Sequence, residues 1–275
     1  MRASSLPLLL KCPGSATLPQ DHTKSDEAIK GSEWGTMVHH WKETGIIRAG
    51  ADKRTGTAFT KAVKLSGVDR HDLWPPGGTH ETTMAVWVGA GDVLADNTEG
   101  GCGRLGASAE AVIGLPGWIS GHSDFHWWLL DGLLWVDDLK TSKLYPNPDE
   151  QWPGHVPHLA VGENRFPELP TSVQLGFYAL ALSLALDYKG DVVASITHWP
   201  RLPLARRHAL PERIWHTYSS GELLSLHDRL RVLDSERRHN ELVVTDGSGT
   251  LKLTPGAHCR FCPSRNFCLA AETFE

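Results

Sequence analysis

A predicted β-hairpin at residues 118–138 constrains the fold of this chain more than any other feature. The apolar run 133–136 is typical of a buried strand, and the turn pair Asp131-Gly132 separates it from a second strand at residues 118–130. The sequence therefore predicts a partly buried β-sheet that includes this hairpin.

Charged side chains lie at the ends of these two strands. Asp138 and Lys140 are two positions apart, which in an extended strand places both side chains on one face, and hairpin pairing brings Asp124 close to them. Carboxylates on a buried sheet are costly unless a cation compensates, and a divalent metal with a neighbouring ammonium is the simplest compensation. On the hairpin alone, solvated turn charges are the alternative interpretation.

Four short motifs follow one another along the chain. They are Gly35-x-x-x-His39, Gly121-x-x-Asp124, Asp138-x-Lys140 and Gln174-x-x-x-Tyr178. In this order, over residues 12–268, they resemble the PD-(D/E)XK nuclease superfamily, and specifically its RecB-like exonuclease branch. The resemblance implies an α/β fold with an αβββαβ core, in which helices flank a mixed sheet.

The resemblance also implies a metal site. Asp124, Asp138, the backbone carbonyl of Leu139 and His39 are expected to hold one or two Mg²⁺ or Mn²⁺ ions. Oxygen ligands suit Mg²⁺, and an imidazole shifts the preference toward Mn²⁺.

The remaining motif residues receive roles around that metal. Lys140 is expected to orient the attacking water or to stabilise a phosphorane-like transition state. Gln174 and Tyr178 lie one helical turn apart and are expected to position the DNA strand and the water. Asp137 alternates to the face opposite Asp138, so we assign it a structural role.

Cysteine spacing predicts a second metal centre. The five cysteines are Cys12, Cys102, Cys259, Cys262 and Cys268. The apolar run near the N-terminus is too short for an export signal, so a disulfide framework is not expected. A Cys-x2-Cys-x5-Cys motif is too compact for separate bridges and suits one metal, with Cys12 as the candidate fourth ligand.

This cysteine pattern resembles the iron–sulfur staple of AddB-type and CRISPR-associated RecB-like nucleases. The resemblance implies a [4Fe-4S] cluster, with zinc as the alternative, held by Cys12, Cys259, Cys262 and Cys268. Residues 1–30 and 240–275 would then form the staple, and closing so long a loop from the unfolded state costs about 5 kcal/mol. Cys102 is left as a spare thiol.

Periodicity and turn signals predict the other elements. Helices are expected at residues 32–48 and 211–238, and from Thr171 or Ser172 onward. Strands are expected at residues 82–88, 108–113 and 191–199. Glu110 in the second of these strands is a further candidate for the metal shell. Insertions are expected at residues 49–80 and 144–171, the latter a proline-rich loop that would roof a DNA channel through Trp152 and Phe166.

Composition bounds the class of protein. The chain has 275 residues, 40% of them hydrophobic, and is expected to form a single domain over 1–275 that is cytoplasmic and has no membrane partner. A net charge of −5 disfavours coating of duplex DNA, which needs a cationic face. Local positive charge is expected from the arginines at 201, 206, 207, 229, 231, 237 and 238, although a solvated helix face explains those after position 212 equally well.

These observations combine into one functional prediction. We expect a metal-dependent DNA exonuclease with an iron–sulfur staple, acting on DNA ends and preferring single strands, in phage-type recombination or repair. A separate helicase or recombinase is the expected protein partner, because the sequence contains no P-loop. The alternatives are a DNA-end-binding module that does not cleave and a zinc-stapled RNA-processing nuclease.

Overall fold

A six-stranded mixed sheet forms the centre of the molecule, in the strand order β2-β1-β3-β4-β5-β6. The computed structural model describes residues 1–21, 26–47, 53–67, 69–70, 74, 77–89, 93–95, 109–113, 115–129, 131–141, 170–199, 212–256, 259, 262–268 and 270–271. The strands are β1 (Thr79–Trp87), β2 (Val93–Ala95), β3 (Trp118–Trp128), β4 (Leu134–Lys140), β5 (Val192–His198) and β6 (Glu212–Tyr218).

Parallel pairing occurs between β4 and β5, and the other neighbouring strands pair antiparallel. Two parallel neighbours need a crossover connection, and helix α6 (Pro170–Ala185) supplies it. The predicted hairpin is confirmed as β3 and β4, and the helix and strand predicted after it are confirmed as α6 and β5.

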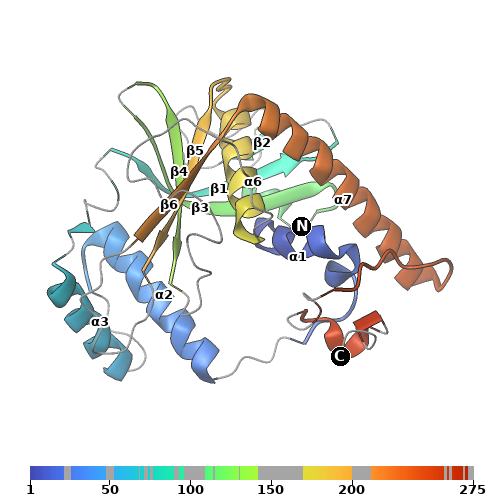
Figure 1. Cartoon of the computed structure of the whole chain (residues 1–275), viewed down its shortest axis with the longest axis horizontal. Helices are drawn as coiled ribbons and strands as arrows, with labels where there is room; N and C mark the ends of the chain where they lie inside the picture. The colour runs from blue at the N-terminus through green and yellow to red at the C-terminus, as the bar shows by residue number, and fades with distance from the viewer. Residues whose placement is uncertain are drawn as a thin grey trace.

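Helices cover both faces of the sheet (Figure 1). Helices α2 (Asp26–Thr44) and α3 (Lys53–Ser66) lie on one face. Helices α1 (Leu6–Lys11), α6 and α7 (Ser220–Asp246) lie on the other. The fold is therefore mixed α/β with a flanked mixed sheet, as predicted at that level.

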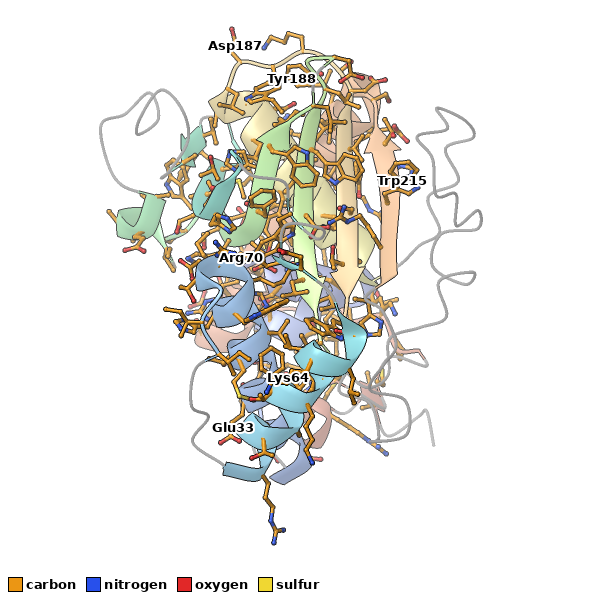
Figure 2. The ribbon with its side chains drawn as sticks, turned by 90° about the vertical axis from the view of Figure 1, so that its left-hand side faces the viewer. Glu33, Lys64, Arg70, Asp187, Tyr188 and Trp215 are labelled. Carbon is orange, nitrogen blue, oxygen red and sulfur yellow. The ribbon has the colours of Figure 1, made fainter. Side chains whose placement is uncertain are left out.

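The two faces of the sheet have different cores. The face under α6 is mainly aliphatic, built from residues such as Ile119, Val136 and Leu182. The face under α2 and α3 is rich in aromatic rings, including Trp34, Trp41, Phe59, Trp74, Phe125, Trp127, Trp135 and Trp199. Figure 2 looks onto this second face, where Trp215 of the edge strand β6 is labelled.

Two predicted elements are wrong in type. Residues 49–80 are not an irregular insertion, because they contain α3, whose buried Thr55, Phe59 and Ala62 repeat at helical spacing against α2. The helix predicted at 211–238 begins too early: residues 212–218 are strand β6, and α7 starts only after Ser219. Ser219 and Glu222 form a capping box there, a start signal stronger than Pro211.

Smaller corrections concern the region before β3 and helix α2. The strand predicted at 108–113 is wrong, since Ala109–Val112 form a 3-10 helix. Glu110 on this helix is exposed and does not belong to the group formed by His39, Glu81 and Asp124. Helix α2 begins before Ser32 and ends at Thr44, where Gly45 takes φ +74° and donates its N–H to the Trp41 carbonyl at 2.7 Å.

Some predictions fall outside the described residues. They include Cys102, Trp152, Phe166, most of the loop 144–171 and the arginines at 201, 206 and 207.

Arginines on α7 are paired with acidic neighbours on the same helix. Arg231 pairs with Asp228, and Arg237 and Arg238 pair with Asp234. The exposed pair of Arg231 and Asp228 agrees with the solvated-face interpretation, whereas Asp234 is buried and Arg237 is largely buried.

The two ends of the chain lie side by side (Figure 1). Asp21 donates its N–H to the Pro263 carbonyl at 2.8 Å. The buried Asn240 of α7 holds the C-terminal segment through two hydrogen bonds with the backbone of Lys252, at 2.7 and 3.0 Å. None of the helices in the described part of the chain is long and apolar enough to cross a membrane.

Candidate active site

The candidate site lies where β3 and β4 separate. The last register pair between these strands is Phe125 with Asp137. Beyond this pair, the Asp124 side chain accepts a hydrogen bond from the Leu139 backbone N–H at 2.5 Å, in place of a backbone hydrogen bond between the strands. The buried Asp124 carboxylate is thus fixed to the backbone of β4 near its C-terminal end. The expected approach of Asp124 to the Asp138–Lys140 segment is confirmed.

Asp138 and Lys140 form an ion pair beside Asp124. Both side chains lie on the same face of β4, as their spacing of two predicts. Leu139 is oriented with its N–H toward Asp124, and the predicted role of its carbonyl as a metal ligand stays a prediction.

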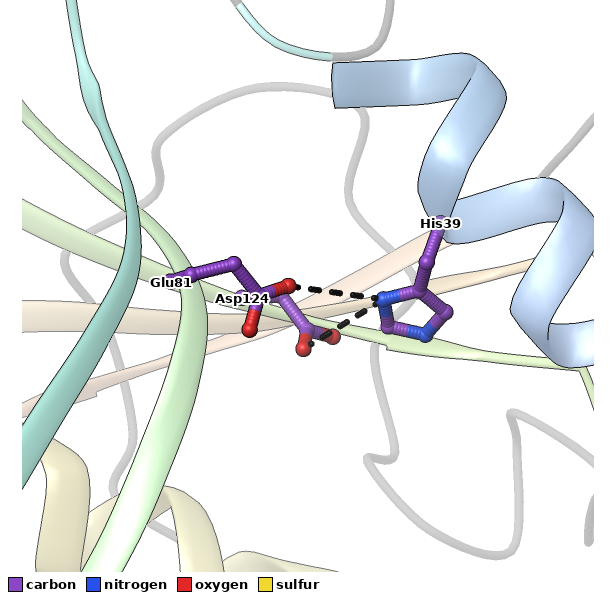
Figure 3. A group of neighbouring side chains, drawn as sticks. All are labelled: His39, Glu81 and Asp124. Atoms are coloured by element: carbon purple, nitrogen blue, oxygen red, sulfur yellow. Dashed lines mark ion pairs between the residues drawn. The ribbon is translucent and has the colours of Figure 1, made fainter. Parts of the chain in front are cut away.

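The His39 side chain points from helix α2 toward Glu81 of β1 and Asp124 of β3 (Figure 3). Its Nδ1 lies 3.5 Å from Asp124 Oδ1 and 3.9 Å from Glu81 Oε1. Ligand atoms of these three residues all lie within 4.8 Å of one another, the spacing of a shared metal ion. Of the predicted ligands, His39 and Asp124 are therefore brought together, with Asp138 next to them.

Glu81 was not predicted from the sequence. It lies between the register pairs His80–Phe125 and Thr82–Ser123, and so opposite Asp124. The available signal was weak: a single acidic residue directly before the strand predicted at 82–88. What sets its position is a backbone φ of +52°, rare for a residue with a side chain.

That unusual backbone makes β1 change face at Glu81. Met84 packs in the aliphatic core under α6, whereas His80 contacts Phe125 and Trp74 in the aromatic core under α2. Residues four apart in a regular strand share a face, so the strand rotates between them. The rotation places the site at the boundary between the two cores.

Two glycines allow helices to approach this boundary. A Cβ atom on Gly35 would lie 2.9 Å from Thr141 Oγ1, just after Lys140, so glycine lets α2 bring His39 near the end of β4. A Cβ atom on Gly121 would lie 2.7 Å from the Tyr178 ring, so glycine lets α6 pack closely on β3. A side chain at either motif glycine would therefore collide with the neighbouring element.

Gln174 and Tyr178 of α6 lie on the side of the sheet opposite α2. The Gln174 amide donates to the Tyr178 hydroxyl at 2.7 Å, and both side chains are buried. Burial, followed by the charge of Asp138, raises the pKa of Tyr178 well above its usual value. Tyr178 therefore remains a hydroxyl that can donate a hydrogen bond toward the carboxylates.

The electrostatics of the site favour a cation. Burial and then the charge of Asp138 raise the pKa of Asp124 to about 7, although His39, the Leu139 N–H and Lys140 oppose the shift. Burial lowers the pKa of His39, but Glu81, Asp124 and Asp138 together raise it above its usual value. Both shifts reflect excess negative charge in a desolvated place, which a divalent ion would neutralise.

An open hollow of about 560 Å³ leads to the site. Its lining includes His39, Glu81, Asp124 and Thr141, and α2 contributes further polar residues, Ser32, Thr36, His40 and Glu43. A polymer chain can therefore reach the three ligand side chains from solvent.

Asp137 has a structural environment, as predicted. It is fully buried and accepts hydrogen bonds from Trp74 Nε1 at 2.7 Å, Thr197 Oγ1 at 2.8 Å and Ser195 Oγ. Such a network fixes the register of β4 on β5 and has no access to the hollow.

The four predicted cluster cysteines line one small cavity. They are Cys12, Cys259, Cys262 and Cys268. Backbone N–H groups of Thr254 and Gly256 donate to the sulfurs of Cys12 and Cys259, each at 3.4 Å. Burial raises the pKa of Cys262, and the other three cysteines add to the shift.

Fold and site together define a mixed α/β protein with a histidine–carboxylate constellation at the end of a β-hairpin. The scan against protein-family models and the search of curated proteins found no match. The search of solved structures found a likeness to the crystal structure of SSO0001, with a TM-score of 0.36, 11% identity and coverage of 98% of this chain and 86% of that one. A functional proposal therefore depends on the geometry of the site and on the motifs.

Without metal, the protein is expected to become less stable as the pH rises from about 4 to about 7. Asp124 has a pKa of about 7 when folded against a usual 3.8, so in this interval the folded chain keeps a proton that the unfolded chain has lost. The loss amounts to at most about 4 kcal/mol. Denaturant titrations across this interval measure it. Mn²⁺ should restore the lost stability. If the free energy of unfolding of Asp124→Asn falls with pH as steeply as that of the wild type, Asp124 is not the group responsible.

Proposed function

We propose that this protein is a metal-dependent DNA exonuclease with a PD-(D/E)XK core of the RecB-like type. The observation that carries the proposal is the convergence of His39, Asp124 and Asp138 from three elements, with Lys140 paired to Asp138 and Glu81 added. One imidazole and several carboxylates are the donor set of a Mg²⁺ or Mn²⁺ site. A structural ion pair alone would not need two buried carboxylates, Asp124 and Asp138, with the exposed Glu81 beside them.

A Mg²⁺ or Mn²⁺ ion held by these residues would supply the Lewis acid that polarises the scissile phosphate and lowers the pKa of the attacking water. The chain's own residues supply the rest. Lys140, held by Asp138, would stabilise the negative charge that grows on the phosphate oxygens. Tyr178, which stays protonated and accepts a hydrogen bond from Gln174, would hold Asp138 or the water in position.

We further propose that the cysteine cavity holds a [4Fe-4S] cluster, which would join the two ends of the chain. All four cysteines line one small cavity, and backbone N–H groups of Thr254 and Gly256 donate to the sulfurs of Cys12 and Cys259. Four thiols with N–H donors to sulfur would suit the thiolate ligands of such a cluster, and zinc is the alternative.

DNA ends are the proposed substrate, with a separate helicase or recombinase as partner. The test compares a 5′-labelled linear single strand, a linear duplex and a closed circular single strand, each with Mg²⁺ or Mn²⁺. We expect degradation of the linear substrates only, fastest for the single strand. Rapid cutting of the circle would contradict an end-dependent enzyme, and binding of ends without any cleavage would favour the non-cleaving alternative.

A further inference from the structure

Trp74 occupies a central position under helix α2. The ammonium of Lys42 lies 3.6 Å from the centroid of its ring, and the ring of Phe125 stacks on it at 5.0 Å with an interplanar angle of 10°. A stacked ring excludes an ammonium from the same face, so Lys42 and Phe125 lie on opposite faces of Trp74. The indole Nε1 donates to Asp137 Oδ2 at 2.7 Å.

Each of these three contacts is next to a residue of the proposed metal site. Lys42 follows His39 by three positions, nearly one turn of α2. Phe125 follows Asp124 directly on β3, and Asp137 precedes Asp138 directly on β4. Trp74 therefore connects the helix and the two strands whose relative placement determines whether their side chains can share one ion.

Lys42 is an unusual residue for a protein core. Its side chain is 2% exposed, and its Nζ has no hydrogen-bond partner among the described residues. Burial lowers the pKa of Lys42 to about 7; Asp137 of β4 and Asp124 of β3 oppose this shift, and Arg213 of β6 adds to it. An ammonium without a hydrogen bond in the core is costly, and among the described residues the face of Trp74 is the contact that compensates it.

We infer that Lys42 and Trp74 are positioning residues that hold α2 against the sheet and thereby set the distance from His39 to the carboxylates of Asp124 and Glu81. This inference rests on the metal site of the proposed function. The attraction between a desolvated ammonium and an indole face supplies the hold. Methionine at position 42 keeps most of the length and volume of the side chain but removes the charge.

The experiment measures Mn²⁺ affinity in the full-length protein without DNA. Lys42→Met should weaken binding about 30-fold, the effect of losing a desolvated cation–π contact. Lys42→Arg should recover part of the loss, because a guanidinium can also lie over the ring. Lys64→Met, at an exposed position of α3 (Figure 2), is the matched control and should bind Mn²⁺ like the wild type.

Two further readouts separate this role from a general effect on folding. Unfolding titrations of the metal-free proteins should show Lys42→Met to be about as stable as the wild type, since removal of a buried charge offsets the lost contact with Trp74. The ratio of wild-type to Lys42→Met affinity should fall toward one as the pH rises above about 7, where Lys42 loses its proton. The direct effect of removing the Lys42 charge on Asp124 has the opposite sign, because a cation near a carboxylate opposes Mn²⁺ binding, so weaker binding by Lys42→Met cannot come from charge alone.

The outcomes are distinguishable. A wild type that binds no Mn²⁺ would overturn the proposed metal site itself. If the wild type and Lys42→Met bind Mn²⁺ equally well, only the positioning role is overturned. The same holds if the ratio of their Mn²⁺ affinities does not change with pH. Trp74→Phe keeps an aromatic face for Lys42 but loses the indole N–H that donates to Asp137. Its Mn²⁺ affinity should lie between those of the wild type and Lys42→Met, and weaker binding than Lys42→Met would contradict the inference.

Discussion

Lys140→Met is expected to lower the cleavage rate at least about 10³-fold, because the ammonium stabilises charge that develops only in the transition state. A loss of about 4 kcal/mol of such stabilisation corresponds to that factor. Mn²⁺ affinity should change little in this variant. Asp138→Ala and Asp124→Ala should lose a similar amount of activity together with most of their Mn²⁺ affinity. Single-turnover cleavage of end-labelled DNA, with Mn²⁺ titration in parallel, measures both effects.

The chain offers a matched control for Lys140. Lys189 also follows an aspartate by two positions and forms an ion pair with Asp187 at 2.7 Å, but both side chains are exposed. Figure 2 shows Asp187 at the end of the molecule opposite Glu33 and Lys64 of the helices on this face. Lys189→Met should leave cleavage unchanged. Equal activity of Lys140→Met and Lys189→Met would remove Lys140 from the mechanism.

Cys12→Ser is expected to bleach the protein and to lower its free energy of unfolding by up to about 5 kcal/mol. The wild type, purified without oxygen, should be brown with broad absorption near about 400 nm. In the proposed cluster, Cys12 would close a loop of nearly the whole chain onto Cys259, so its loss would release both ends together. Absorption, iron content and denaturant titration measure the three consequences.

Cys102→Ser is the control for the cluster and should keep both the colour and the stability of the wild type. A colourless wild type that contains one zinc per chain would contradict the cluster while leaving the stapled ends intact. A brown Cys12→Ser variant of unchanged stability would contradict the choice of Cys12 as ligand.

The hairpin that carries Asp124, Asp138 and Lys140 could be predicted because its signals are local. A turn pair, an apolar run and a spacing of two residues determine which face each side chain takes. The approach of Gly35 and Gly121 to their neighbours also agrees with motifs that are visible in the sequence. Local chemistry was sufficient for this part of the site.

The contribution of Glu81 could not be predicted in the same way. Its place opposite Asp124 depends on the register between β1 and β3, two strands separated by about thirty residues. It also depends on a positive φ at Glu81 itself, a conformation that the sequence usually signals by a glycine. Lys42 and Trp74 were missed for a similar reason, since their contact joins a helix to a segment that follows another helix. Non-local register and packing decide such positions.

The misplaced helix start at 211 shows how two local signals compete. Pro211 is typical of a first helical turn, but residues 213–218 alternate between the two faces of the sheet, with Trp215 on the aromatic side and Tyr218 on the aliphatic side. Ser219 and Glu222 then begin the helix. Pairing with β5 over the whole of β6 outweighs the proline preference.

The dependence of cleavage on free Mn²⁺ in metal-depleted protein tests the central claim most directly. The expected result is no cleavage of an end-labelled single strand without metal, a saturable rise as Mn²⁺ is added, and a midpoint that moves to higher Mn²⁺ in His39→Ala, since that variant loses a nitrogen ligand. Cleavage in excess chelator, or none at saturating Mn²⁺, would contradict a metal-dependent nuclease at this site.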